Sequence, residues 1–328
     1  MKNKNKILKI IKNFTNMKIG VLGDFCVDFY WEINPNMSEK SLNTSMMASK
    51  AENPRYFLGG AGNVAKNIIS LSDNKINPVC FGAISNDPFG LWMKNNLPNS
   101  DNVVVYDKYH TAVYCKPIIQ ETEQPRIDFG NIELPDEYAD ILLERIRVGI
   151  EKIDVLIINQ QLKRGIHTPY FRKGLFDIIQ KNKQNKIFIS DVRSNFESYI
   201  GSIFKINSYA ASLFAFKEDG RCPIESGMIL LRKYNAPLVI TDGINGSYIF
   251  ENENYKHIPS IPQAGKIDTI GAGDAFTSGF AYAISCGANM ETSAEFATCC
   301  SSVVVKKIHQ AGFPTKQELK ILLKEINE

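Results

Sequence analysis

The sequence predicts an α/β fold in which a doubly wound, mostly parallel sheet is flanked by helices on both faces. Short apolar runs rich in β-branched residues alternate with amphipathic stretches along most of the 328 residues. Such alternation is typical of parallel sheets, because each crossover between parallel strands needs a helix. Two polar, alternating stretches interrupt this rhythm, so we expect a small β-sheet lid beside the main sheet. No linker or internal repeat divides the chain, which indicates a single domain over 1–328.

The expected central strands are the buried apolar runs of the chain. In order they read KIGVLGD, PVCFGAIS, DVLIIN, KIFISDV and PLVITDG. Helical periodicity follows the first strand in GNVAKNIISLS, and DPFGLWMKNNL follows the second with Asp87 as its N-cap. Near the N-terminus, Ile7, Leu8, Ile11 and Phe14 recur at helical spacing, which predicts a short amphipathic helix packed on the body.

The lid is expected from about 25–58 and 106–130. These segments contain strand-like pieces such as TAVYCKPII and PRIDF, which are too polar for a central sheet. Ordinary surface loops are the alternative, but loops of this length without secondary structure are uncommon. Lid strands leave open edges, so a homodimer through the lid is one expected assembly.

Composition excludes several classes of protein. Lys and Arg number 38 against 35 Asp and Glu, so the net charge is +3, and neither nucleic acid nor a membrane is expected as a partner. No apolar run reaches transmembrane length, and Lys9 and Lys12 interrupt the one at the N-terminus, so no signal peptide is predicted. The 7 cysteines are odd in number and lack C-x-x-C spacing, which disfavours a disulfide framework or a zinc site. These features together predict a cytoplasmic protein with buried thiols.

The stretch DTIGAGDAF carries the candidate chemistry. It lies between an extended segment and a helical one, so its glycines are expected at a helix N-terminus, where free N–H groups bind anions. Asp274 then falls in the first turn of this helix. A carboxylate repels a resting phosphate, but it can deprotonate a hydroxyl that attacks phosphorus. An aspartate that merely caps the helix is the structural alternative.

A second glycine turn supports a ligand site. FLGGAGNVAKNI places Gly59 and Gly60 before a helix whose early turn carries Asn63, an amide that suits the vicinal hydroxyls of a sugar. Asp24 ends the first strand, at the edge of the sheet where α/β proteins bind ligands. Asp28 follows at the base of the lid, so both carboxylates can accept hydrogen bonds from hydroxyls.

These motifs together resemble the ribokinase-like (PfkB) family of carbohydrate kinases over nearly the whole chain. Residues 268–274 match the signature D-T-x-G-A-G-D, and residues 59–65 match G-G-x-x-N-x-A. Residues 241–246 match T-x-G-x-x-G, in a segment that also reads as a simple hairpin turn. The resemblance implies a ribokinase-like fold and ATP-dependent phosphorylation of a hydroxyl on a sugar or sugar phosphate.

The resemblance also implies roles for individual residues. Asp274 would be the catalytic base, and the backbone of Gly271, Ala272 and Gly273 would hold the transferred phosphoryl group. The substrate-binding residues would be Asp24, Asp28, Gly59, Gly60, Asn63, Lys116 and Arg126. The residues that border ATP would be Asn207, Thr241, Gly243, Gly246 and Ser301. Mg²⁺ would accompany the phosphates, and a monovalent cation such as K⁺ would bind beside Asp268.

A more specific resemblance is to the bacterial D-glycero-β-D-manno-heptose 7-phosphate kinases. It rests on GDFCVDFYW, GGAGNVAKNI, Lys116 followed by RIDF, and SDVR. It implies conversion of heptose 7-phosphate to the 1,7-bisphosphate, with Lys116 and Arg126 on the distal phosphate. The chain departs from the family where Asn159 and Gln160 end a strand, and where Ala210 replaces an acid near the metal. A ribokinase-, fructokinase- or nucleoside kinase-like enzyme for an unphosphorylated acceptor, and a non-catalytic sugar-binding regulator, are the alternatives.

Overall fold

The computed structural model describes residues 2–12, 15–108, 110–130 and 133–326. Its main sheet has the strand order β14-β13-β12-β11-β10-β9-β1-β4-β5. The parallel strands are β1 (Ile19–Gly23), β4 (Val79–Ile84), β5 (Val103–Val105), β9 (Val155–Asn159), β10 (Ile187–Asp191), β11 (Ile203–Asn207) and β12 (Leu238–Thr241). An antiparallel hairpin, β13 (Ser247–Glu251) and β14 (Asn254–Ile258), closes one edge. The predicted doubly wound α/β class is confirmed.

Helices cover both faces of the main sheet and divide the core into two clusters. The first cluster packs α1 (Lys4–Lys12), α2 (Ala61–Leu71), α3 (Pro88–Asn96), α8 (Ala272–Ser285), α9 (Met290–Val304) and α10 (Lys316–Glu325). The second packs α4 (Asp136–Ile150), α5 (Pro169–Asn182), α6 (Ser208–Phe216) and α7 (Pro223–Tyr234). Short 3₁₀ turns lie at η1 (Ser100–Asn102), η2 (Phe196–Tyr199) and η3 (Gly243–Asn245). Strand side chains alternate between the clusters, as Val21 and Leu22 do, because successive residues of a strand point to opposite faces.

Two local predictions about helices are confirmed. The carboxylate of Asp87 accepts a hydrogen bond from the N–H of Gly90 at 2.7 Å and caps α3. Helix α1 packs on the body with Ile7 and Ile11 buried. Phe14, which was expected to extend the same apolar face, lies outside the described residues.

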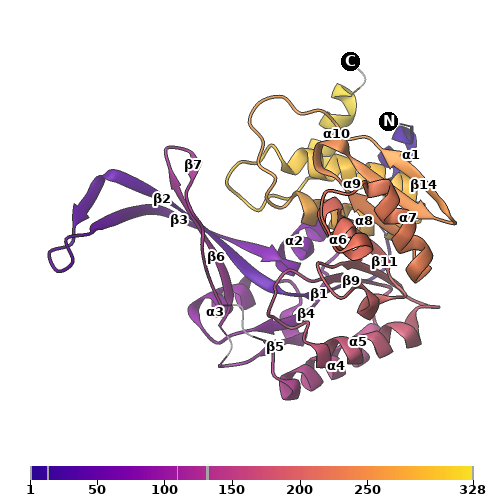
Figure 1. Ribbon diagram of the computed structural model, residues 1–328, viewed down its shortest axis with the longest axis horizontal. Coiled ribbons are helices and arrows are strands. Elements are labelled where there is room, and N and C mark those ends of the chain that lie inside the picture. The colour runs from indigo at the N-terminus through magenta and orange to yellow at the C-terminus, as the bar shows by residue number, and fades with distance from the viewer. Residues whose placement is uncertain (1, 13–14, 109, 131–132, 327–328) are drawn as a thin grey trace.

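A second sheet projects from the body (Figure 1). It is built from β2 (Phe25–Lys40), β3 (Met47–Gly60), β6 (Ala112–Ile119), β7 (Thr122–Glu123) and β8 (Ile127–Phe129). Four of these strands fall within the two segments predicted for the lid, and β3 runs two residues past the predicted end at 58. We call the five strands the lid sheet. The long β2–β3 hairpin packs on the body at its base. There the ring of Phe29 stacks on that of Tyr56, with 4.4 Å between the ring centres, and both rings pack near Phe89 of α3.

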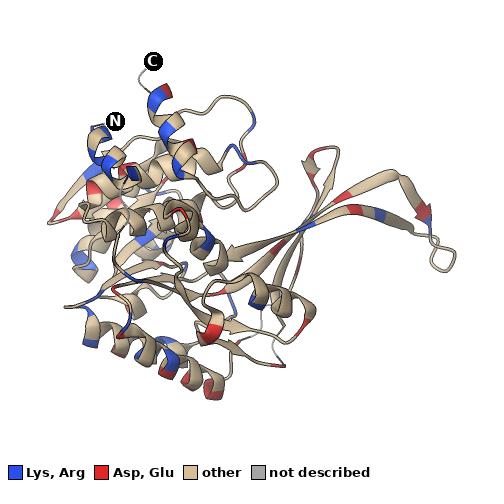
Figure 2. Ribbon diagram, turned by 180° about the vertical axis from the view of Figure 1, so that it is seen from behind, with Lys and Arg blue, Asp and Glu red and all other residues tan. Residues whose placement is uncertain are grey.

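Figure 2 shows acidic and basic residues interspersed on the helices that cover the body. Within the described part of the chain, no helix is both long and apolar enough to cross a membrane. All seven cysteines are unpaired thiols, and five of them are buried, with Cys222 exposed and Cys286 half-buried.

Asp24 joins three elements at the carboxyl edge of the sheet. Its side chain is 1% exposed and accepts hydrogen bonds from the backbone N–H groups of Gln161 and Leu162, both at 2.9 Å, and of Ile166, at 3.1 Å. Its own carbonyl accepts from the N–H of Ala61, the first residue of α2. The carboxylate, predicted to bind a sugar, is therefore engaged with the loop after β9, while the backbone carbonyl of the same residue holds the start of α2.

The Asp24→Asn variant should be less stable than the parent by about 2–3 kcal/mol. An amide has one acceptor oxygen, so its NH₂ group would face at least one of the backbone donors that the carboxylate now satisfies. Urea unfolding measures the change as a lower midpoint at constant m-value. Asp219→Asn, at an exposed position, is the matched control and should leave the midpoint unchanged. If Asp24→Asn keeps the parent's midpoint and instead loses affinity for a sugar, the carboxylate binds substrate.

Candidate active site

The glycine-rich stretch predicted to bind phosphate forms the start of α8. Gly271 caps this helix with φ at 76°, a left-handed conformation that a residue without a side chain adopts readily. The N–H of Ala272 closes a turn on the carbonyl of Thr269 at 3.2 Å. The N–H groups of Gly273 and Asp274 lie in the first turn, where no preceding helical carbonyl can accept them. They are the donors that this helix end offers to an anion.

Asp274 is positioned by the neighbouring helix α2. The amide Nδ2 of Asn63 donates to Asp274 Oδ2 at 2.9 Å. Burial raises the pKa of Asp274 to about 7, the hydrogen bond from Asn63 opposes this rise, the negative charge of Asp191 adds to it, and the positive charge of Lys205 opposes it. A carboxyl group with a pKa near neutrality can accept and release a proton at physiological pH, which is what a general base requires.

Asp274 lines a pocket of about 500 Å³ between the lid sheet and the carboxyl ends of β10, β11 and β12. We call it the first pocket. The predicted residues that line it are Asp28, Gly60, Lys116, Arg126, Asn207, Thr241, Gly271, Gly273 and Asp274. The lining also includes Tyr114, Gln161, Asp191, Arg193 and Lys205, which were not predicted as site residues. The tertiary structure therefore brings together the two lid segments, three strand ends and one helix end that are far apart in the sequence.

Three predicted sugar-binding residues stand outside this lining. Asp24 holds the loop after β9, as described above. Both polar atoms of the Asn63 amide form hydrogen bonds within the protein. Its Oδ1 accepts from Nδ2 of Asn67 at 3.1 Å, and its Nδ2 donates to Asp274. Gly59 lies behind Asp28, and a Cβ added to Gly59 would stand 2.8 Å from the carboxylate of Asp28. These residues support the pocket wall.

A second pocket of about 700 Å³ adjoins the first. Asn207, Thr241, Thr269 and Gly273 line both pockets. All five residues predicted to border ATP line the second one, namely Asn207, Thr241, Gly243, Gly246 and Ser301. The predicted hairpin turn is present as well, because β12 and β13 pair antiparallel across it. The start of α8 thus lies where two adjoining pockets meet.

Asn207 and Ala210 lie together at the start of α6. Asn207 caps this helix, since its Oδ1 accepts from the N–H of Ala210 at 2.7 Å. Ala210 lines the first pocket with a methyl group at the position where the family resemblance expects an acid. No group of three or more His, Cys, Asp or Glu side chains in the described ranges is arranged to hold a metal ion.

Asp268 draws two distant segments together. Its Oδ1 accepts from the N–H of Ile270, and its Oδ2 accepts from the N–H of His309, both at 2.9 Å. As a result, Ala311 and Gly312 lie beside Gly271, with their backbone atoms 3.6–3.7 Å from where its Cβ would stand. Residues 268–271 and 309–312 therefore face each other next to the anion-binding end of α8.

Some of the pocket residues that were not predicted as site residues could have been found from the geometry of strands. Lys205 precedes Asn207 by two positions on β11, and side chains two apart on a strand share a face. Asp191 ends β10 and Arg193 follows it by two residues, in the SDVR stretch that contributes to the resemblance to heptose 7-phosphate kinases. Tyr114 had the same signal, because it precedes Lys116 by two positions on β6. Gln161 had none, because only the loop after β9 brings it to the pocket.

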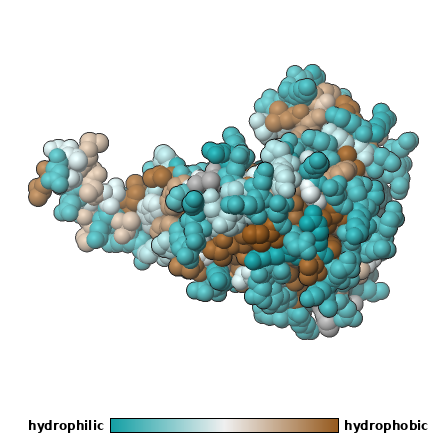
Figure 3. Space-filling view, turned by 90° about the horizontal axis from the view of Figure 1, so that it is seen from below, coloured by the Kyte–Doolittle hydropathy of each residue, from teal (hydrophilic) through white to brown (hydrophobic). Residues whose placement is uncertain are grey.

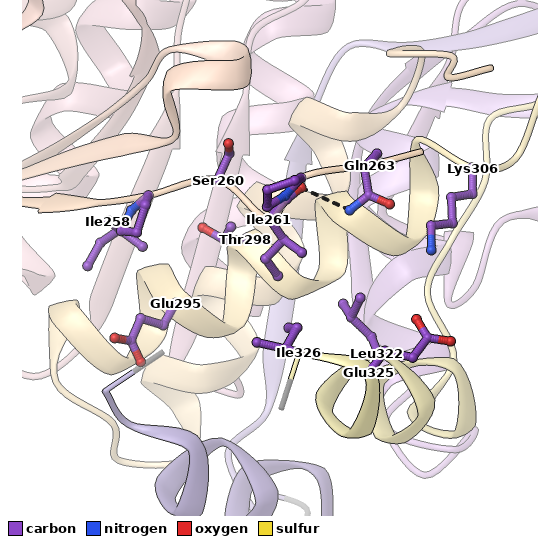
Figure 4. Close-up of a pocket in the computed structure, with 12 residues that line it drawn as sticks. Ile258, Ser260, Ile261, Gln263, Glu295, Thr298, Lys306, Leu322, Glu325 and Ile326 are labelled. Carbon is purple, nitrogen blue, oxygen red and sulfur yellow. Dashed lines mark hydrogen bonds between the residues drawn. The ribbon is translucent and has the colours of Figure 1, made fainter. Parts of the chain in front are cut away.

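A smaller cavity of about 360 Å³ shares the segment 260–263 with the second pocket (Figure 4). Its lining includes Ile258, Leu322 and Ile326, and the Gln263 amide donates to the carbonyl of Ile261 at 2.9 Å. It contains none of the predicted site residues.

Comparisons with known proteins identify the family and the fold of the chain. The family model described as "pfkB family carbohydrate kinase" matches residues 26–316. The chain is 27% identical over 315 residues to the bifunctional protein HldE of Sulfurimonas denitrificans, covering 93% of this chain and 64% of that protein. The chain thus spans less than two thirds of this relative's length.

Solved structures of kinases share the fold. The structure of phosphofructokinase-2 from Escherichia coli in complex with potassium superposes with a TM-score of 0.73, at 15% identity over 95% of this chain and 100% of that one. Ribokinase from Arabidopsis thaliana, complexed with ribose and ATP, superposes with a TM-score of 0.68, at 18% identity over 94% of this chain and 99% of that one.

The match to the family model covers most of the chain, and the signature from Asp268 to Asp274 forms the helix start between the two pockets. The protein therefore belongs to the pfkB family of carbohydrate kinases.

Proposed function

We propose that the protein transfers the γ-phosphoryl group of ATP to a hydroxyl of a sugar phosphate, and that heptose 7-phosphate, converted to the 1,7-bisphosphate, is the leading candidate acceptor. The observation that carries this proposal is the setting of Asp274. Its carboxyl group has a pKa of about 7, is fixed by Asn63, and stands at a helix end that offers free N–H groups to an anion.

In this proposal the acceptor occupies the first pocket and the nucleotide the second. Gly273 lines both, so the transferred group would pass the N-terminus of α8 there. Lys205 Nζ lies 3.3 Å from where a Cβ on Gly273 would stand, and its charge would add to the attraction for phosphate. Asp274 would take the proton of the attacking hydroxyl. Mg²⁺, which neutralises phosphate charge when bound, would be held by phosphate oxygens and water near Asn207, because Ala210 supplies no carboxylate.

The choice of a sugar phosphate draws on two kinds of support. Relatives named HldE are similar over most of this chain, although they extend beyond it. The first pocket is also lined by four basic side chains, Lys116, Arg126, Arg193 and Lys205. We further propose that the protein works in the cytoplasm, where ATP is available and unpaired thiols such as Cys222 stay reduced.

The proposal is tested by ATP consumption on a panel of acceptors. We expect kcat/KM to be highest for heptose 7-phosphate, lower for fructose 6-phosphate, and lowest for unphosphorylated heptose, fructose, ribose and adenosine. A preference for a free sugar or nucleoside would assign the enzyme to the alternative class of acceptor. Absence of phosphoryl transfer to every acceptor would favour a sugar-binding regulator.

Asp274→Asn is the matched variant for this panel, because it keeps the shape of the side chain and cannot accept a proton. It should lower kcat by about 10²–10⁴-fold while ATP still binds. In the parent, kcat/KM should rise as the pH increases through about 7, since burial raises the pKa of Asp274 to about 7 and only the deprotonated carboxylate can act as a base. A pH profile that is flat from 5.5 to 8.5 would remove the assigned role.

We propose a monovalent cation site where residues 268–271 face residues 309–312. K⁺ should raise kcat and the melting temperature relative to tetramethylammonium at equal ionic strength, because a small cation would order this segment through backbone carbonyls and the large one cannot enter. The melting temperature is a readout that does not depend on turnover. Equal melting temperatures and rates in the two salts would exclude the site.

We also propose a homodimer through the lid sheet. Strand β3 is an open edge of that sheet, and the apolar side chains of Leu42, Met46 and Met47 are exposed near the far end of the β2–β3 hairpin, where Figure 3 shows hydrophobic surface. Light scattering of the parent should report a mass twice that of one chain. The double variant Leu42→Glu with Met46→Glu should have the mass of a single chain. Ile321→Glu, an exposed apolar position on α10, should keep the dimer. A parent protein that has the mass of one chain at 50–100 μM would contradict the dimer.

A further inference from the structure

The basic side chains of the first pocket differ in whether a carboxylate neutralises them. Lys116 Nζ lies 2.5 Å from Asp28 Oδ1, and Lys205 Nζ lies 3.0 Å from Asp191 Oδ2; all four of these residues are buried. Both paired lysines are therefore compensated inside the protein, and separating either one from its partner would leave a buried, unpaired charge.

Arg126 is also paired, although it is exposed. Its Nε and Nη2 donate to the two carboxylate oxygens of Asp128 at 2.7 and 2.8 Å, and its guanidinium lies 4.5 Å from the ring centre of Tyr114. The fork of donors that would grip a phosphate is thus already occupied by a carboxylate. Arg126 was predicted to bind the distal phosphate of the acceptor, and its contacts favour a different assignment.

Arg193 is the one basic residue of this lining for which the described part of the chain provides no carboxylate. Its guanidinium donates to the neutral Oε1 of Gln161. Its backbone is fixed, because the N–H groups of Arg193 and Ser194 both donate to Oε1 of Gln160, at 3.1 and 3.0 Å. A guanidinium has five N–H donors, so a single amide contact leaves most of them for a ligand.

We infer that Arg193 binds the phosphate that the acceptor already carries and thereby selects phosphorylated over unphosphorylated sugars. This inference rests on the proposed function. Residues 191–193 run from the end of β10 along the pocket wall, so the acceptor would lie with its reacting hydroxyl at Asp274 and its phosphate at Arg193, beside Tyr114. An exposed, unpaired guanidinium on a fixed backbone binds a phosphate in a bidentate manner without first breaking an ion pair.

The test compares Arg193→Gln with Arg126→Gln and with Arg147→Gln. Arg147 is exposed on α4, away from the pocket, and is the control for loss of one surface guanidinium. Titration calorimetry with heptose 7-phosphate and with unphosphorylated heptose measures binding without turnover. Arg193→Gln should weaken binding of the phosphorylated sugar about 10- to 100-fold, Arg126→Gln by a smaller factor, and Arg147→Gln not at all.

Two further readouts separate phosphate binding from a general structural effect. Arg193→Gln should keep the parent's melting temperature and flatten the salt dependence of binding, because the contact it removes is between charges. Arg193→Lys, which keeps the charge but loses the planar fork, should recover part of the affinity.

Each outcome bears on a different claim. Undiminished binding of heptose 7-phosphate by Arg193→Gln would overturn the inference, as would a parent that binds the phosphorylated and unphosphorylated sugars equally well. A parent that binds heptose 7-phosphate through Arg193 but transfers no phosphoryl group would uphold the inference and refute the proposed function.

Discussion

The hydrogen bond between Asn63 and Asp274 is the interaction on which the site depends. It joins the first turns of α2 and α8, two helices that begin 211 residues apart and pack in the same apolar cluster. Because the donor is a neutral amide, the bond fixes the direction of the carboxyl group without supplying a positive charge, and burial can keep its pKa near neutrality. A lysine at the Asn63 position would favour the charged form of Asp274 and would weaken it in the proposed role of base.

Charged side chains surround Asp274, the acid whose pKa lies near neutrality. Two carboxylates in the first pocket, Asp28 and Asp191, each have a lysine as partner, so their charges are largely cancelled. Asp191 also accepts from the hydroxyl of Thr277 on α8, at 2.7 Å, which connects the strand end to the helix that bears Asp274. These buried pairs position the walls of the pocket, whereas Asp274 and Arg193 have neutral amides, those of Asn63 and Gln161, as their side-chain partners.

The pocket exists because two sheets meet at one edge. The parallel strands β10, β11 and β12 deliver Asp191, Asn207 and Thr241 to the carboxyl edge of the main sheet, where open α/β sheets bind ligands. The lid sheet provides the opposite wall through β2 and β6, which pair in parallel from Cys26 to Glu32. Asp24 links the elements at this junction, because its carboxylate accepts hydrogen bonds from the loop after β9 and its backbone carbonyl accepts one from Ala61 at the start of α2.

The sequence alone determined the α/β class and a helix start at the glycines of DTIGAGDAF, because both depend on local periodicity or on turns that need glycine. The family was indicated by the resemblance of its motifs to those of carbohydrate kinases. The sequence also indicated five of the residues that line the second pocket, namely those predicted to border ATP. In the sequence, four polar residues all look like candidates to bind the substrate, namely Asp24, Asn63, Lys116 and Arg126. Only the tertiary structure decided which partner each side chain contacts. Their partners are backbone groups, amides and carboxylates whose positions depend on how strands and loops pack, and no sequence spacing encodes which polar group a neighbour has already satisfied.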